Sequence, residues 1–118
     1  MDNIFNILLV ALIIYQLHNF YLIYKAPTIL GVDAKKAKKQ NAFFVDVRSE
    51  GEYLNGHIQG SKNIPLNQLS KRLSEIPNDT QVIVVCQSGS RSARGTMKLL
   101  KSGFPNVYSL KGGMAAWK

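Results

Sequence analysis

The only cysteine of the chain, Cys86, lies where a run of apolar residues changes to small and charged ones. The segment VVCQSGSRSAR, residues 84–94, also contains Gly89 and Arg91. A cysteine acts as a nucleophile in its thiolate form, which backbone N–H groups and a nearby cation stabilise. The segment therefore indicates a reactive cysteine, and the competing interpretation is a thiol that packs as a small apolar side chain. With one cysteine, an internal disulfide and a cysteine-rich zinc site are both excluded.

Two secondary-structure elements are expected to position Cys86. The run QVIVVC, residues 81–86, is the strongest strand signal in the sequence, and residues 92–103 are typical of a helix that ends on a glycine. In parallel α/β sheets, ligands bind at the carboxyl ends of strands, and a helix N-terminus adds partial positive charge there. We therefore expect the loop N–H groups to bind an anion beside the sulfur. The predicted binding residues are Gln87, Ser88, Gly89, Ser90, Arg91 and Ser92.

Three charged residues outside this loop are expected to support it. Asp46 and Arg48 end a neighbouring strand, and Glu52 follows shortly after. The guanidinium of Arg91 has two possible roles, because it either binds the incoming anion or pairs with one of these carboxylates. We favour pairing with Asp46 or Glu52, since a buried arginine needs a carboxylate partner.

The sequence after residue 25 alternates between strand and helix patterns. Ser49 begins a capping box with Glu52, and Asp33 suits the N-cap of an earlier short helix. This alternation predicts an α/β fold with a small central parallel sheet flanked by helices. Strands are expected at 28–32, 42–47, 63–65, 81–86 and 106–110, and helices at 33–39, 50–54, 66–76, 92–103 and just before the C-terminus.

Three segments of the sequence resemble a single-domain rhodanese, a thiosulfate sulfurtransferase-like protein. They are FVDVRSEGEYLNGHIQGSKNIP at 44–65, VIVVCQSGSRSA at 82–93 and LKGGMAAW at 110–117, in the family's order and spacing. The resemblance covers nearly all of residues 28–118 and implies the rhodanese-like α/β fold. It also implies an architectural role for His57.

The same resemblance implies a chemical role for Cys86. Its thiolate would take a sulfur atom from thiosulfate or a persulfide donor and pass it, through a Cys86 persulfide, to a thiol or cyanide acceptor. We expect no metal ion and no organic cofactor in this reaction.

Three alternatives to sulfur transfer fit parts of the sequence. Cysteine-dependent phosphatases and arsenate reductases use the pattern C-x5-R, whereas the loop from Cys86 to Arg91 is one residue shorter and suits a sulfur atom better than a phosphate. A membrane-tethered docking or regulatory module without turnover is the second alternative. A redox sensor is the third, and it requires a partner thiol because the chain has one cysteine.

The N-terminal segment has a different composition from the rest of the chain. Residues 4–24 contain no Asp, Glu, Lys or Arg, and as a helix they extend over about 31 Å, close to the hydrocarbon thickness of a bilayer. Phe20, Tyr21 and Tyr24, followed by Lys25, are typical of an interfacial anchor. No positive charge precedes the apolar run and no small-residue cleavage site follows it, which disfavours a signal peptide. A membrane span is therefore predicted, with a surface-bound or packed helix as the alternative.

The predicted organisation is a transmembrane helix at 1–24 and a rhodanese-like domain at 25–118, of which 25–32 is a linker. All 15 Lys and Arg residues follow residue 24. By the positive-inside rule, the protein is a single-pass protein of the cell membrane with its C-terminal domain in the cytoplasm. The basic run Lys35–Lys39 either contacts anionic lipid or forms a solvated helix face, two interpretations of equal weight. We find no helix with stacked basic residues and no aromatic–basic alternation, so no nucleic-acid partner is expected despite the net charge of +8.

Overall fold

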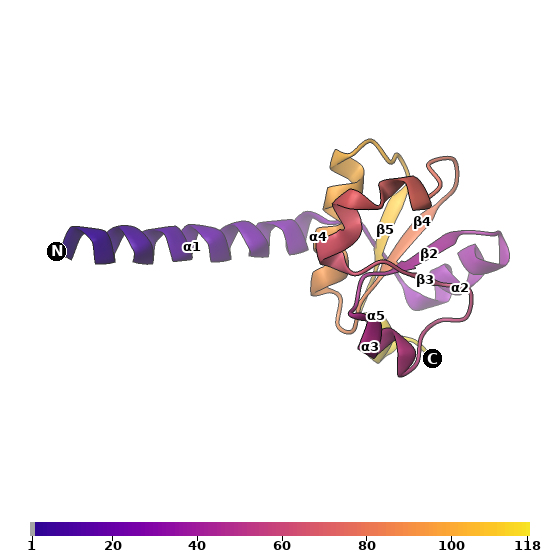
Figure 1. Cartoon of the computed structure of the whole chain (residues 1–118). Coiled ribbons are helices and arrows are strands. Elements are labelled where there is room, and N and C mark those ends of the chain that lie inside the picture. Colours follow the sequence, from indigo (N-terminus) through magenta and orange to yellow (C-terminus); the bar gives the residue numbers. More distant parts are fainter. Residues whose placement is uncertain (1) are drawn as a thin grey trace.

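Within residues 2–118, which a computed structural model describes, five parallel strands form one sheet in the order β1-β5-β4-β2-β3 (Figure 1). The most apolar strand, β4, lies at the centre and is buried along its whole length, as its run of β-branched residues predicts. The α/β class predicted from the sequence is therefore confirmed. The strands are β1 Thr28–Ile29, β2 Phe43–Asp46, β3 Lys62–Asn63, β4 Val82–Val85 and β5 Val107–Leu110.

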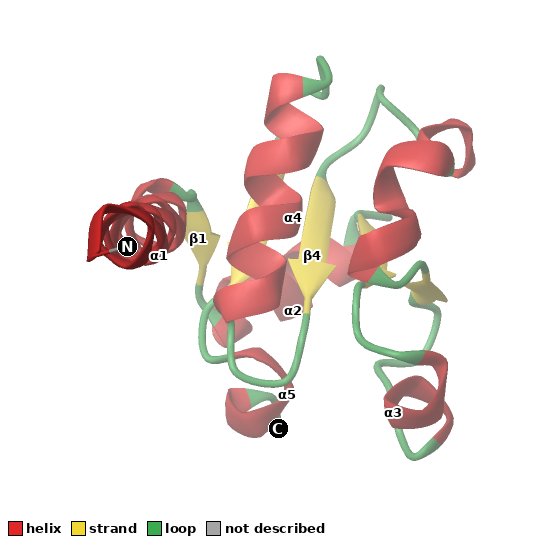
Figure 2. Ribbon diagram, turned by 60° about the vertical axis from the view of Figure 1, so that its left-hand side comes forward, coloured by secondary structure: helices red, strands yellow, loops and turns green. Residues whose placement is uncertain are grey.

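Helices cover both faces of this sheet (Figure 2). One core cluster lies between the sheet and the face formed by α4 and the 3-10 helices η1 and η2, and it includes Val84, Leu69 and Leu99. A second cluster lies between the opposite face and α2 and α5, and it includes Ile83 and Ala34. The helices are α1 Asp2–Lys25, α2 Gly31–Lys39, α3 Glu50–Leu54, η1 Leu66–Lys71, η2 Leu73–Glu75, α4 Ser90–Lys101 and α5 Gly113–Ala116.

The predicted helix at 66–76 is wrong in type. It forms the 3-10 helices η1 and η2, which are separated at Arg72. The apolar positions explain this outcome, because Leu66 and Leu69, and likewise Leu73 and Ile76, are three residues apart. A spacing of three aligns side chains on a helix with three residues per turn.

Two predicted helix starts are also wrong. Asp33 is not the N-cap of α2, since Leu30 holds that position without a side-chain cap and Asp33 lies in the first helical turn. The α4 helix begins at Ser90 rather than Ser92, because Gly89 adopts a left-handed conformation with φ of 111° and forms the N-cap. Few residues other than glycine adopt this backbone conformation.

The long helix α1 projects away from the sheet and contacts the rest of the chain near its C-terminal end, beside α4 (Figure 1). Its segment Asn3–Lys25 has a mean hydropathy of 1.8 and, within residues 2–118, is the helix long and apolar enough to cross a membrane. None of the residues in its 18-residue apolar window is buried inside the domain. The core helix of a soluble protein would be mostly buried, and α1 is not.

Candidate active site

The position of Cys86 follows from the alternation of side chains along β4. Val82 and Val84 point toward α4, so the next residue on that face is Cys86, directly after the end of the strand. The strand runs toward the edge of the sheet where α3 and α5 also lie (Figure 2). The thiol is fully buried, with 0% of the residue exposed.

One backbone N–H group at the N-cap of α4 is directed toward this thiol. The N–H of Gly89 donates a hydrogen bond to Cys86 Sγ at 3.0 Å, and in the described part of the chain it is the one loop N–H that does so. The earlier start of α4 moves Ser90, Arg91 and Ser92 from the predicted loop into the first helical turn. The sulfur therefore lies at the helix N-terminus, where the partial positive charge favours an anion.

A pair of buried hydroxyl groups extends this polar contact. Cys86 Sγ lies 3.4 Å from Ser92 Oγ, which is 2.7 Å from Ser109 Oγ on β5. The Ser92 hydroxyl also donates to the carbonyl of Gly89 at 3.1 Å. In the contact with sulfur the Cys86 thiol is the donor, so Ser92 donates to a thiolate only when its single proton turns from the Gly89 carbonyl to the sulfur. The sequence predicted Ser92 as a backbone donor only, and it missed Ser109, whose one signal was a polar residue inside an apolar strand.

The short helix α5 binds the backbone on the other side of Cys86. The N–H groups of Met114 and Ala115 donate to the carbonyl oxygens of Cys86 and Gln87 at 2.8 and 3.0 Å. Both carbonyls are thereby turned toward α5. Gly113 makes this approach possible, because a Cβ there would collide with the carbonyl of Cys86 and the backbone of Gln87. Gly113, Met114 and Ala115 were not among the site residues predicted from the sequence.

An ion pair connects α3 to the first turn of α4. Arg91 donates two parallel hydrogen bonds to Glu52, at 2.7 and 2.9 Å, so Glu52 is its partner rather than Asp46. Glu52 also accepts from the backbone of Ser49, and the predicted capping box is present. Hydrogen bonds from Arg91 first, and then from the Ser49 backbone, lower the pKa of Glu52 from 4.5 to about 2. The same pairing with Glu52 raises the pKa of Arg91.

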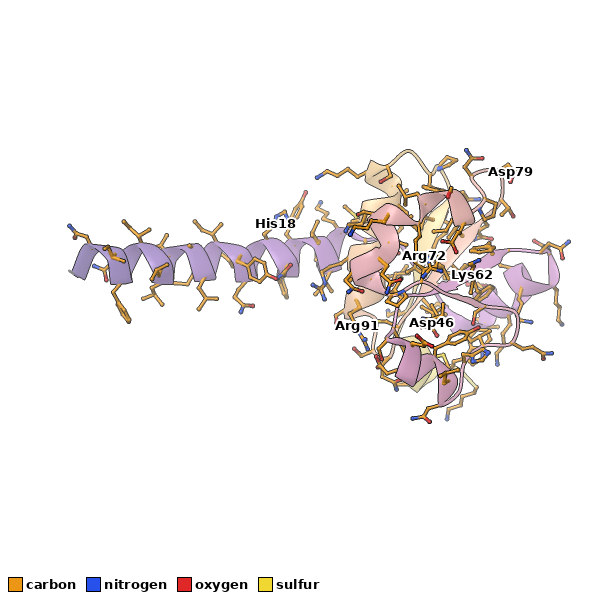
Figure 3. All side chains as sticks on the ribbon, viewed as in Figure 1. His18, Asp46, Lys62, Arg72, Asp79 and Arg91 are labelled. Carbon is orange, nitrogen blue, oxygen red and sulfur yellow. The ribbon has the colours of Figure 1, made fainter. Side chains whose placement is uncertain are left out.

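Asp46 and Arg48 form a second, buried ion pair beside the loop (Asp46 and Arg91 are labelled in Figure 3). Arg48 Nη2 lies 2.8 Å from Asp46 Oδ2 and donates to the carbonyl of Gly56 at 2.7 Å. Its Nη1 reaches Gln87 Oε1 at 3.5 Å, which is a long contact. The pair thus connects the end of β2 to the loop, the position expected of supporting residues.

The other singled-out residues lie around this centre. Gln87, Ser88 and Ser90 are exposed at the surface of the loop. His57 Nδ1 donates a hydrogen bond to the carbonyl oxygen of Tyr53 at 2.8 Å, and its ring stacks on the Tyr53 ring, which is an architectural contact. Residues 2–118 contain no group of three or more His, Cys, Asp or Glu side chains arranged to hold a metal ion.

Comparison with known proteins gives the family. The model of the rhodanese-like domain matches residues 32–118, which include every site residue described above, and the chain belongs to that family. The resemblance seen in the sequence to a single-domain rhodanese is confirmed.

Relatives of the chain include proteins named as sulfurtransferases. Bacillus subtilis YqhL is 37% identical over 111 residues, covering 94% of this chain and 88% of YqhL. Thiosulfate sulfurtransferase GlpE of Shewanella oneidensis is 37% identical over 73 residues, covering 62% of this chain and 72% of GlpE. The crystal structure of a rhodanese-related protein from Thermoplasma volcanium is 30% identical with a TM-score of 0.72, over 77% of this chain and 89% of that one. The alignment with YqhL is longer than residues 32–118, so it includes part of the α1 segment.

The contact between α5 and the loop predicts the effect of Gly113→Ala. The added Cβ meets the backbone of the loop, and φ of 57° is already unfavourable for alanine. We expect the free energy of unfolding to fall by about 1–3 kcal/mol and iodoacetamide to alkylate Cys86 faster, because the loop no longer closes over the thiol. Gly31→Ala is the control, since nothing lies within 4 Å of its Cβ position. Equal alkylation rates for Gly113→Ala and the wild type would contradict the proposed contact.

The Glu52–Arg91 pair predicts a defined pH dependence of stability. Because the pKa of Glu52 is lowered to about 2, its stabilising effect is complete above about pH 4.5 and is lost as the pH falls through about 2. Glu52→Gln keeps the capping box but not the charge. We expect it to lower the free energy of unfolding at pH 7 by about 1 kcal/mol or less, as is typical of partly exposed pairs, and to flatten the profile between pH 4.5 and 2.

The matched control for this measurement is Glu50→Gln, which removes a charge from the same helix without touching Arg91. Denaturant unfolding of the three proteins from pH 7 to pH 2 gives the comparison. If the wild type and Glu52→Gln show the same pH profile, the ion pair does not stabilise the loop.

Proposed function

We propose that the protein is a membrane-anchored sulfurtransferase that moves sulfane sulfur from thiosulfate or a persulfide donor to a thiol or cyanide acceptor through a Cys86 persulfide. One observation carries this proposal: the sole thiol lies under the N-terminus of α4, within hydrogen-bond distance of the Gly89 N–H. The sulfurtransferase names of relatives such as GlpE support the same class of reaction.

The first half of the reaction loads the cysteine. The Cys86 thiolate attacks the outer sulfur of thiosulfate, a new S–S bond forms, and the S–S bond of the donor breaks with its electron pair leaving on sulfite. The product is a Cys86 persulfide with one negative charge. The Gly89 N–H and the helix N-terminus are the groups placed to stabilise that charge, and the Ser92 hydroxyl joins them when its proton turns from the Gly89 carbonyl to the sulfur.

The second half returns the cysteine to its starting state. An acceptor thiolate or cyanide attacks the terminal sulfur, the persulfide bond breaks, and its electron pair stays on Cys86 as a thiolate. Cys86 therefore ends the cycle in the oxidation state in which it began, and the cycle needs no external oxidant or reductant. Because Cys86 is fully buried, donor and acceptor reach the sulfur when the exposed loop residues Gln87 and Ser88 move aside.

The membrane placement rests on α1 and on the distribution of charge. Its apolar side chains are exposed, including Leu9 at 47% and Ile13 at 49%, and a bilayer provides the apolar environment they lack. All Lys and Arg residues follow this helix, which favours a cytoplasmic domain by the positive-inside rule. We propose a single-pass protein of the cell membrane with residues 1–24 in the bilayer and the rhodanese-like domain in the cytoplasm.

Sulfur loading is the direct test of the proposed activity. We expect thiosulfate to add about 32 Da, one sulfur atom, to the intact protein and to release one equivalent of sulfite. Cys86→Ser should show neither product, and cyanide should remove the added mass from the wild type as thiocyanate. Hydrolysis of an aryl phosphate without sulfite release would favour a phosphatase instead. Unchanged cellular function in Cys86→Ala would favour a docking module.

Membrane insertion is tested with the full chain. We expect the protein to stay in the membrane fraction after carbonate extraction, and its domain to resist protease added outside intact cells. A Leu9→Arg, Ile13→Arg double variant should leave the membrane, because each charge at the bilayer centre costs roughly 2.5–3.5 kcal/mol. Both positions are exposed, so the domain should stay folded. Extraction of the wild type by carbonate would contradict the membrane span.

A further inference from the structure

A hollow of about 800 Å³ lies where α1 meets α4 and is lined by residues of both helices. Three cations line it, Arg94, Lys98 and Lys101. They occupy one stripe of α4, because positions separated by four and then three residues share a helix face. The expectation that no helix stacks basic residues is therefore wrong for α4.

These three cations have no acidic partner. None of them forms a salt bridge within residues 2–118, whereas Arg48, Lys62, Arg72 and Arg91 all do. The α4 helix itself contains no Asp or Glu. Lys98 and Lys101 are exposed and Arg94 is half-buried, so the stripe is open to an anion from outside the chain.

The remainder of the hollow is mostly apolar. Leu22 comes from α1, Leu66 from η1, and Met97 and Leu100 from α4. Leu22, Leu66, Met97 and Leu100 are all half-buried, so each keeps apolar surface open to the hollow. A ligand that fits must therefore present an anionic group to the stripe and an apolar chain to these side chains.

The depth of α1 in the bilayer places this hollow at the membrane surface. This step rests on the proposed membrane span. His18 and Leu22 line the hollow beside α4, so this part of α1 cannot lie among lipid tails with the α4 cations next to it. The segment free of the domain, residues 4–17, is about 21 Å long, so the hydrocarbon core of about 30 Å must thin around α1. Residues 18–24 of the proposed span, including Asn19, and the α4 stripe then lie at the level of the lipid headgroups.

We propose that this hollow binds an anionic phospholipid, with its phosphate on the stripe formed by Arg94, Lys98 and Lys101 and an acyl chain along Leu22 and Met97. The charge complementarity and the continuity with α1 select a membrane lipid as the occupant. The basic run on α2 is less well placed for this role, because α2 lies on the opposite face of the sheet from α4 (Figure 1).

Native mass spectrometry of the full-length protein in a non-ionic detergent tests this site. The probes are dioleoyl phosphatidylglycerol and dioleoyl phosphatidylcholine, titrated separately. We expect phosphatidylglycerol to bind with at least tenfold higher affinity. An Arg94→Gln, Lys98→Gln, Lys101→Gln variant should lose roughly 100-fold in that affinity, about fivefold per charge.

The matched control is Lys36→Gln, Lys38→Gln, Lys39→Gln, which removes three exposed charges from α2. This variant should bind phosphatidylglycerol as the wild type does. Equal losses in the two variants, or no preference between the two lipids, would overturn the proposal. Inorganic phosphate at about 10 mM, a concentration typical of a buffer, is added as a competitor. If it displaces the lipid completely, the hollow binds any anion and the lipid proposal is overturned.

Two further readouts separate this proposal from the proposed function. Thermal unfolding of each variant shows that it is folded, and sulfur loading of Cys86 reports the activity independently. A protein that accepts sulfur but shows no lipid preference lacks the lipid site only. A protein that prefers phosphatidylglycerol but accepts no sulfur keeps the lipid site and contradicts the sulfurtransferase activity.

Discussion

The backbone around Cys86 is oriented by two hydrogen bonds from α5, a helix near the C-terminal end of the sequence. Met114 and Ala115 of α5 donate to the carbonyls of Cys86 and Gln87, and the close approach depends on the absence of a side chain at Gly113. The two peptide units that α5 holds carry the N–H groups of Gln87 and Ser88, and the next N–H along the chain, that of Gly89, donates to the sulfur. The α5 helix therefore fixes the backbone immediately before the N–H group that contacts the sulfur.

Charged groups hold the same backbone from the opposite side. Glu52 keeps Arg91 at the first turn of α4 with two hydrogen bonds, and the low pKa of about 2 for Glu52 means that this contact survives moderate acid. The buried Asp46–Arg48 pair contributes a weaker contact to Gln87. Since Arg91 is already satisfied by a carboxylate, its main effect is to shape the loop. In the proposed reaction, the helix N-terminus and the Gly89 N–H stabilise the charge on the sulfur.

Local patterns in the sequence predicted much of this arrangement, because strand burial, the Ser49 capping box and the position of Cys86 after β4 all depend on neighbouring residues. Contacts between distant segments were harder to predict. Nothing near Cys86 in the sequence indicates that α5 binds its carbonyl or that Ser109 contacts Ser92. The basic stripe on α4 was missed although it could be predicted, because Arg94, Lys98 and Lys101 follow helical spacing within the helix expected at 92–103.

The central claim is that this backbone geometry holds one extra sulfur atom on Cys86. A crystal structure of the protein after reaction with thiosulfate tests it most directly. The account predicts electron density for a second sulfur bonded to Cys86 Sγ, within hydrogen-bond distance of N–H groups at the start of α4, with Met114 and Ala115 still bound to the loop carbonyls. A second sulfur that points away from α4, or a loop released from α5 in the loaded protein, would contradict the account.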